Sequence, residues 1–98
     1  MKQIPTMDFL TFVKTKEGQE LQTSARKAKF SVRVTKGGLE FLPHSTMKPR
    51  PHDLGRLERI LQQFAETESY KTNEYKHYTI CSSYTLTLIN QYLAEHSP

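Results

Sequence analysis

Cysteine and tryptophan are scarce in this chain of 98 residues, which has one cysteine, Cys81, and no tryptophan. A single cysteine excludes an intramolecular disulfide framework and suits a reducing compartment, so we expect a cytoplasmic protein. No apolar run approaches the roughly 20 residues of a membrane-spanning helix, and we expect no membrane association. The first residues, Met-Lys-Gln-Ile-Pro, also lack the apolar stretch of a signal peptide.

Motifs of the common enzyme classes are missing as well. The chain has no glycine-rich phosphate loop, no HExxH and no GxSxG, and its acids are sparse and scattered. His77 and Cys81 are four residues apart and could share a helical face as metal ligands or as a base and a nucleophile. Their spacing matches no recognised zinc pattern, and a buried structural thiol is the favoured interpretation. We therefore expect a non-enzymatic protein with no catalytic residue, metal site or cofactor.

Positive charge is concentrated in the first part of the chain. Up to Arg56 there are eleven lysines and arginines against five acids, a net charge of +6, whereas the remainder has a net charge of −2. The total of +4 is a mild excess that many proteins without a nucleic-acid partner share. The polarised distribution is therefore the informative feature.

The chain length fits one domain, residues 1–98. A helix is predicted at about 7–17, because Phe9, Phe12 and Val13 recur at helical spacing, with Thr6 as its cap and Gly18 as its end. Residues 19–28 are ambiguous: residues 20–23 could continue the helix or begin a short strand, and residues 24–27 are predicted to be a connector.

A β-hairpin is predicted at about 29–43. Apolar and polar residues alternate from Lys29 to Thr35, which is typical of a half-buried strand, and Lys36-Gly37-Gly38 favours a tight turn. Arg33 and Glu40 should share the solvent face, and Pro43 should end the pairing. A polar, basic connector is predicted at 44–53.

Helices are predicted in the rest of the chain. Asp53 should cap a helix at about 54–67, in which Leu57, Ile60, Leu61 and Phe64 form the apolar face. A short helix is expected at 73–78 and a last one at about 84–95, capped by Ser82 or Ser83, with Thr85, Thr87 and Asn90 facing away from the core. A helix-turn-helix unit is disfavoured, because the intervening segment exceeds the usual three- or four-residue turn. The predicted fold is α+β: an N-terminal helix, a central β-hairpin, then two or three C-terminal helices.

The basic connector and the hairpin charges predict a surface that attracts phosphates. Hydroxyls of the connector and of the last helix would add hydrogen-bond donors. The leading hypothesis is a small protein that binds nucleic acid, double-stranded DNA, through backbone contacts. The expected contact residues are Lys29, Arg33, Lys36, Thr46, Lys48, Arg50, Ser82 and Ser83.

The alternative hypothesis is a protein–protein interaction module, such as an inhibitor, an adaptor or a small phage-type protein. All five tyrosines lie in the last third of the chain. Tyrosine is rigid and amphipathic, and it is common at interfaces. The expected anchors are Tyr70, Tyr75 and Tyr78.

Overall fold

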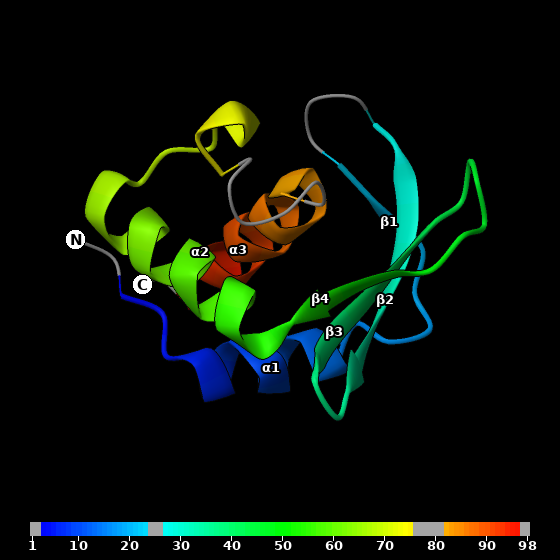
Figure 1. The fold of residues 1–98 in the computed structure, drawn as a ribbon, viewed down its shortest axis with the longest axis horizontal. Helices are drawn as coiled ribbons and strands as arrows, with labels where there is room; N and C mark the ends of the chain where they lie inside the picture. Colours follow the sequence, from blue (N-terminus) through cyan, green and yellow to red (C-terminus); the bar gives the residue numbers. More distant parts are fainter. Residues whose placement is uncertain (1–2, 24–26, 76–81, 97–98) are drawn as a thin grey trace.

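The protein combines a four-stranded antiparallel sheet with three α-helices, which confirms the predicted α+β class (Figure 1). The computed structural model describes residues 3–23, 27–75 and 82–96. The strands lie side by side in the order β1-β2-β3-β4. The elements are α1 (Thr6–Lys14), β1 (Leu21–Gln22), β2 (Lys29–Thr35), β3 (Gly38–Pro43), β4 (Arg50–Asp53), α2 (Leu54–Thr67), the 3-10 helix η1 (Thr72–Tyr75) and α3 (Ser82–His96).

The predicted hairpin forms from β2 and β3. Val32 pairs with Phe41 and Arg33 with Glu40, so the buried and exposed residues alternate as the sequence indicated. The loop between the paired residues Thr35 and Gly38 is only two residues long. The expectation of an Arg33–Glu40 pair on the solvent face is confirmed, because Arg33 Nε lies 2.8 Å from Glu40 Oε1.

The predicted connector is wrong in its last four residues, Arg50–Asp53, which form strand β4. Leu39 pairs with His52 and Phe41 with Arg50. Pro51 is tolerated because β4 is an edge strand, where a missing N–H costs no pairing. His52 is only 2% exposed and packs against the ring of Phe41, with their centroids 5.8 Å apart. Burial lowers the pKa of His52 below its ordinary value of 6.5.

Helix α2 begins and ends at the residues that the sequence predicted, Leu54 and Thr67. Asp53 caps it by accepting from the backbone N–H of Arg56 at 3.0 Å. The cap predicted for α1 is wrong. That helix starts at Thr6 itself, after Pro5, and has no side-chain cap hydrogen bond.

Helix α3 is buried on more sides than the sequence predicted. Thr85 is fully buried and Thr87 is 6% exposed, whereas both were expected to face away from the core. The reason is that α3 packs against the sheet, α1 and η1 together. It starts at Ser82, two residues earlier than predicted, so Ser82 and Ser83 are its first helical residues and not a preceding cap.

Element η1 replaces the start of the short helix predicted at 73–78, and residues 76–78 lie outside the described part of the chain. Tyr75 at its end is fully buried. Its hydroxyl donates to the carbonyl oxygen of Ser69 at 2.7 Å. Tyr75 therefore belongs to the core.

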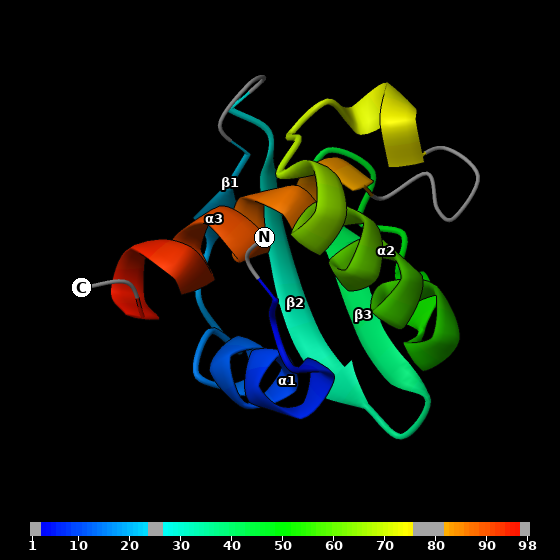
Figure 2. The ribbon, with the colours of Figure 1, turned by 90° about the vertical axis from the view of Figure 1, so that its left-hand side faces the viewer.

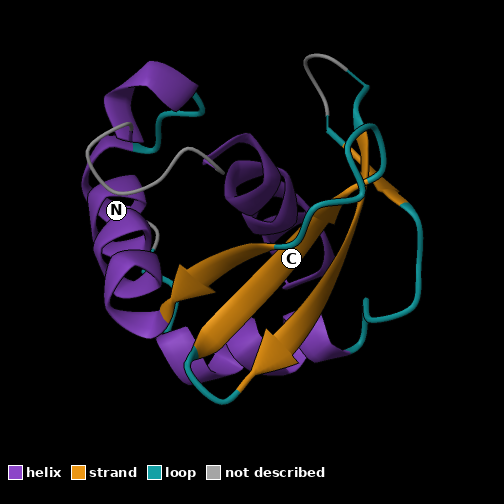
Figure 3. Ribbon diagram, turned by 45° about the vertical axis from the view of Figure 1, so that its right-hand side comes forward, coloured by secondary structure: helices purple, strands orange, loops and turns teal. Residues whose placement is uncertain are grey.

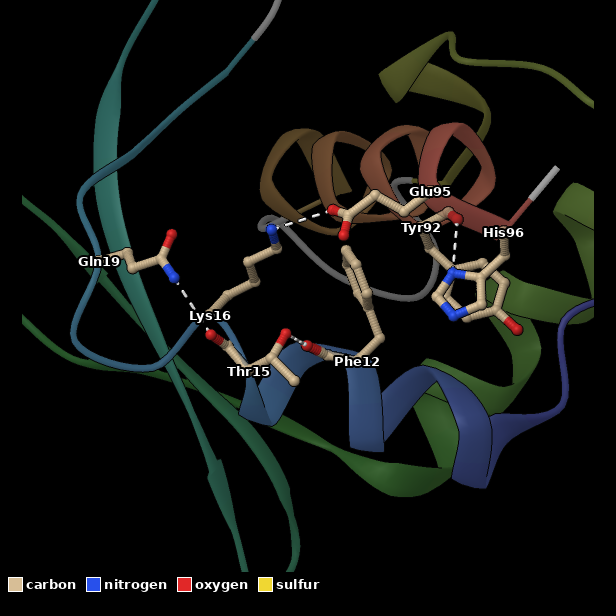
Figure 4. Close-up of polar contacts among 7 residues, drawn as sticks. All are labelled: Phe12, Thr15, Lys16, Gln19, Tyr92, Glu95 and His96. Atoms are coloured by element: carbon tan, nitrogen blue, oxygen red, sulfur yellow. Dashed lines mark hydrogen bonds and ion pairs between the residues drawn. The ribbon is translucent and has the colours of Figure 1, made fainter. Parts of the chain in front are cut away.

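Aromatic contacts and an ion pair connect the end of α1 with the end of α3 (Figure 4). The Tyr92 ring meets Phe12 edge-on at 5.5 Å and stacks on His96 at 4.2 Å. The Lys16 ammonium lies 3.0 Å from the carboxylate of Glu95 and 5.1 Å from the Phe12 ring centroid. Lys16 is thus engaged within the fold.

All three α-helices lie on one side of the sheet, and no described helix covers the other side (Figures 2 and 3). The two-residue strand β1 pairs only with the start of β2. Further along β2, the N–H of Val34 donates to a carboxylate oxygen of Glu17 at 2.8 Å. None of the described helices combines the length and apolarity needed to cross a membrane.

Candidate nucleic-acid interface

Two loops leave the sheet at the same end. Gln22 pairs with Lys29 beside the β1–β2 loop, and Pro43 pairs with Phe30 immediately before the β3–β4 loop. In Figure 1 the β3–β4 loop and the described ends of the β1–β2 connection lie at the upper right of the sheet. We call this region the loop end, and it comprises Lys27, Lys29, residues 44–50 and the first turn of α3.

The start of α3 reaches the loop end from the helix-covered side. The Tyr84 ring lies 4.6 Å from that of Phe30 and 5.5 Å from that of Phe41, measured between centroids. Arg50 is the register partner of Phe41 and therefore projects from the same side of the sheet. Arg50 and the first turn of α3 thus lie on one side of the sheet, and Lys29 on the other.

The β3–β4 loop has a defined shape. The N–H of Met47 donates to the carbonyl of Pro43 at 2.8 Å, and Met47 takes a φ of 55°. The Thr46 hydroxyl accepts from the N–H of Lys48 at 3.3 Å. Because Pro49 follows Lys48, the backbone there is biased to an extended conformation. The Thr46 side chain is therefore tied to the backbone of Lys48.

The cations of the loop end have few acidic partners. Lys29 lies 3.4 Å from Glu20. Lys27, Lys48 and Arg50 form no ion pair with any described residue. Cations without acidic partners at one end of a small fold attract the phosphates of a nucleic-acid backbone. Lys27 was not among the residues that the sequence pointed to, because it lies in the ambiguous segment 19–28.

Two of the predicted contact residues lie apart from the loop end. Lys36 is in the hairpin turn at the opposite end of β2, about 20 Å from Lys29 for a strand of this length. Arg33 lies part-way along the strand and is held by Glu40. Folding therefore places Lys29, Thr46, Lys48, Arg50 and Ser83 at the same end of the sheet, with Lys29 on the open face and Arg50 on the helix-covered side, whereas Arg33 and Lys36 lie away from this end.

Four polar side chains meet beside the loop end, on the open face. His44 Nε2 lies 2.7 Å from the Ser31 hydroxyl, and His44 Nδ1 lies 3.8 Å from Glu20 Oε2. The other oxygen of Glu20 is the one that faces Lys29. Sequence reasoning missed this cluster, because strand pairing brings Glu20 to residues 9 and 24 positions further along the chain.

The order of these groups resembles a Ser–His–acid relay, but the geometry is incomplete. A relay requires a hydrogen bond on each side of the imidazole. The 3.8 Å separation of His44 Nδ1 and Glu20 Oε2 is too long for a hydrogen bond. The chemistry that this arrangement offers is anion binding, from an ammonium, an imidazole and a hydroxyl.

The tyrosines of the alternative hypothesis do not form one exposed surface among the described residues. Tyr75 is buried, and Tyr70 is 46% exposed and packs on Phe64 with ring centroids 5.1 Å apart. Tyr78 lies outside the described residues, as do His77 and Cys81. Within the described ranges no group of three or more histidine, cysteine and acidic residues could hold a metal.

Comparison with family models, with curated proteins and with solved structures gives no match to this chain.

Proposed function

We propose that this protein binds nucleic acid, double-stranded DNA, through phosphate contacts at the loop end. The observation that carries the proposal is that Lys27, Lys29, Lys48 and Arg50 come from two separate segments and lie at the same end of the sheet, where Glu20 pairs with Lys29 alone among these four. The hydrogen bonds within the β3–β4 loop support it, because a preorganised contact loses less conformational entropy on binding. A cytoplasmic setting, suggested by the single cysteine, is part of the proposal.

The first turn of α3 supports the same location. The N-terminal end of a helix carries a partial positive charge that favours an anion. Tyr84 anchors this turn over the β2–β3 pair at the loop end, next to the side from which Arg50 projects. The helix start and the basic loops could thus contact phosphates of one duplex.

Salt dependence tests the proposal directly. If four cations each neutralise one phosphate, affinity should fall by about a hundredfold between roughly 50 and 200 mM salt. Fluorescence anisotropy with a labelled random-sequence duplex of about 20 base pairs measures this. Binding that is absent, or that does not weaken with salt, would refute the proposal.

A pair of matched variants tests the location. The double variant Lys48→Ala/Arg50→Ala should lower affinity at least about tenfold and roughly halve the salt slope. The control Lys14→Ala/Arg59→Ala removes the same charges from exposed positions on α1 and α2 and should bind within about threefold of the unaltered protein. Equal losses in the two variants would place binding elsewhere. Because Arg50 is half-buried, circular dichroism should confirm folding, and Lys48→Ala alone gives a second test.

A further inference from the structure

The carboxylate of Glu20 occupies a position suited to a phosphate group. Its two oxygens lie 3.4 Å from Lys29 Nζ and 3.8 Å from His44 Nδ1. A carboxylate and one edge of a phosphate both present two oxygens to such donors. An ammonium, an imidazole and a neighbouring hydroxyl are the groups with which proteins hold phosphates.

The donors are held in place by the backbone. The N–H of His44 donates to the carbonyl of Lys29 at 2.9 Å, which fixes the two residues side by side. The Ser31 hydroxyl, 2.7 Å from His44 Nε2, orients the imidazole ring. The His44 side chain is only 29% exposed, so the surroundings restrict its movement further.

Glu20, in contrast, is loosely held. Its side chain is 57% exposed, and its carboxylate contacts Lys29 and His44 of this cluster. Exposed ion pairs of this kind contribute little to stability, so a stronger anion can displace the carboxylate at low cost. Glu20 also precedes β1, whose pairing with β2 is only two residues long.

We infer that Lys29 and His44 form a phosphate site, with the His44 ring oriented by Ser31, and that Glu20 occupies this site in the free protein. Glu20 then acts as an internal competitor, and a phosphate group enters only by displacing it. The ligand class is a phosphate, of a nucleic-acid backbone or free in solution. The inference deepens the proposed function and rests on it for the nucleic-acid ligand alone.

The key variant is Glu20→Gln, with Glu40→Gln as its matched control. Glu40 is also an open-face acid paired with a cation, Arg33, but it lies outside the cluster. Both changes raise the net charge by one, so both should strengthen duplex binding slightly through long-range electrostatics. Glu20→Gln should strengthen it about tenfold, against about twofold for the control. Adding Ser31→Ala or His44→Ala to Glu20→Gln should cancel the extra gain.

Inorganic phosphate provides a test that does not depend on nucleic acid. In ¹H–¹⁵N spectra, phosphate should shift the amides of Lys29, Ser31 and His44 at lower concentration in Glu20→Gln than in Glu40→Gln. Equal behaviour of the two variants would overturn the inference, because net charge alone would explain it. Weaker binding by Glu20→Gln would also overturn it, since Glu20 would then serve to position Lys29.

The two proposals fail in distinguishable ways. If duplex binding is salt-sensitive but Glu20→Gln has no selective effect, the phosphate site occupied by Glu20 is refuted and the proposed function is not. If phosphate binds at Lys29 and His44 but no duplex binds, the proposed function is refuted and the phosphate site is not.

Discussion

Alanine at Gly38 should severely destabilise the protein, whereas alanine at the neighbouring Gly37 should not. Gly38 has a φ of 147°, a conformation that residues with a Cβ rarely adopt. A Cβ at this position would also lie 2.4 Å from the carbonyl oxygen of His52 and 2.8 Å from the backbone nitrogen of Leu54. Both atoms belong to the junction of β4 and α2, which cannot move aside as a flexible side chain could.

The cost of Gly38→Ala has two parts. A residue forced into this backbone region costs on the order of 1–3 kcal/mol. Displacing packed backbone adds about 1–3 kcal/mol, as overpacked substitutions do. The junction also contains the hydrogen bond from the Leu54 N–H to the Gly37 carbonyl, at 2.8 Å. We therefore expect a loss of about 3–5 kcal/mol, a large part of the stability of a small domain.

Gly37 provides the control within the same turn. A Cβ there meets no atom within 4 Å, so Gly37→Ala should change the free energy of unfolding by no more than about 0.5 kcal/mol. Urea unfolding followed by circular dichroism measures the stability of both variants. Their midpoints are compared if the dependence of the unfolding free energy on urea concentration is the same. Faster amide exchange at Leu54 in Gly38→Ala would locate the damage. If the two variants differ by less than about 1 kcal/mol, the close approach of Gly38 to the β4–α2 junction is not the constraint described.

Four further substitutions test the helices, the core and the buried histidine. Because burial holds the pKa of His52 below 6.5, the unfolded chain takes up a proton below that pH while the folded chain does not. The His52 contribution to stability should therefore fall as the pH drops from 6.5, by at most about 1.4 kcal/mol per pH unit, and the difference in urea midpoints between the unaltered protein and His52→Gln across this range measures it. Asp53→Ala should cost about 0.5–2 kcal/mol through the lost cap of α2, while Gly55→Ala, with open space around it, should gain about 0.4–1 kcal/mol in the same unfolding assay. Tyr75→Phe should cost about 1 kcal/mol by removing the donor to the Ser69 carbonyl, which thermal unfolding would detect as a lower Tm.

The parts of the fold that the sequence predicted well are those whose signal is local. The hairpin follows from the alternation in β2 and the glycines of its turn, and α2 follows from Asp53 and the apolar spacing that begins at Leu57. Each pattern lies within a single element, so the chain needs no distant partner to specify it.

The missed elements depend on distant partners. Arg50 of β4 lies between Pro49 and Pro51, and His52 is the one buried side chain of the strand. The sequence of β4 therefore resembles a connector. It becomes a strand because β3 offers a free edge. Thr85 and Thr87 of α3 are polar but buried, because elements packed on several sides of that helix override its own pattern.

The candidate site was foreseen in part for the same reason. Positive charge in the first half was visible, and so was the constrained connector with Lys48. Strand register decides which cations meet, and register could not be derived once β4 was missed. The cluster of Glu20 with Lys29 and His44 requires β1, β2 and the end of β3 to be placed together.

The carboxylate of Glu17 has a consequence for how other chains can associate with this one. Beyond the two residues of β1, the outer border of β2 would present free backbone groups to any extended peptide. Glu17 satisfies the amide of Val34 and also sets a negative charge there. On the opposite border, Pro51 interrupts the row of donors in β4. Both borders therefore discourage strand addition, so aggregation by edge-to-edge growth should be slow in the folded state.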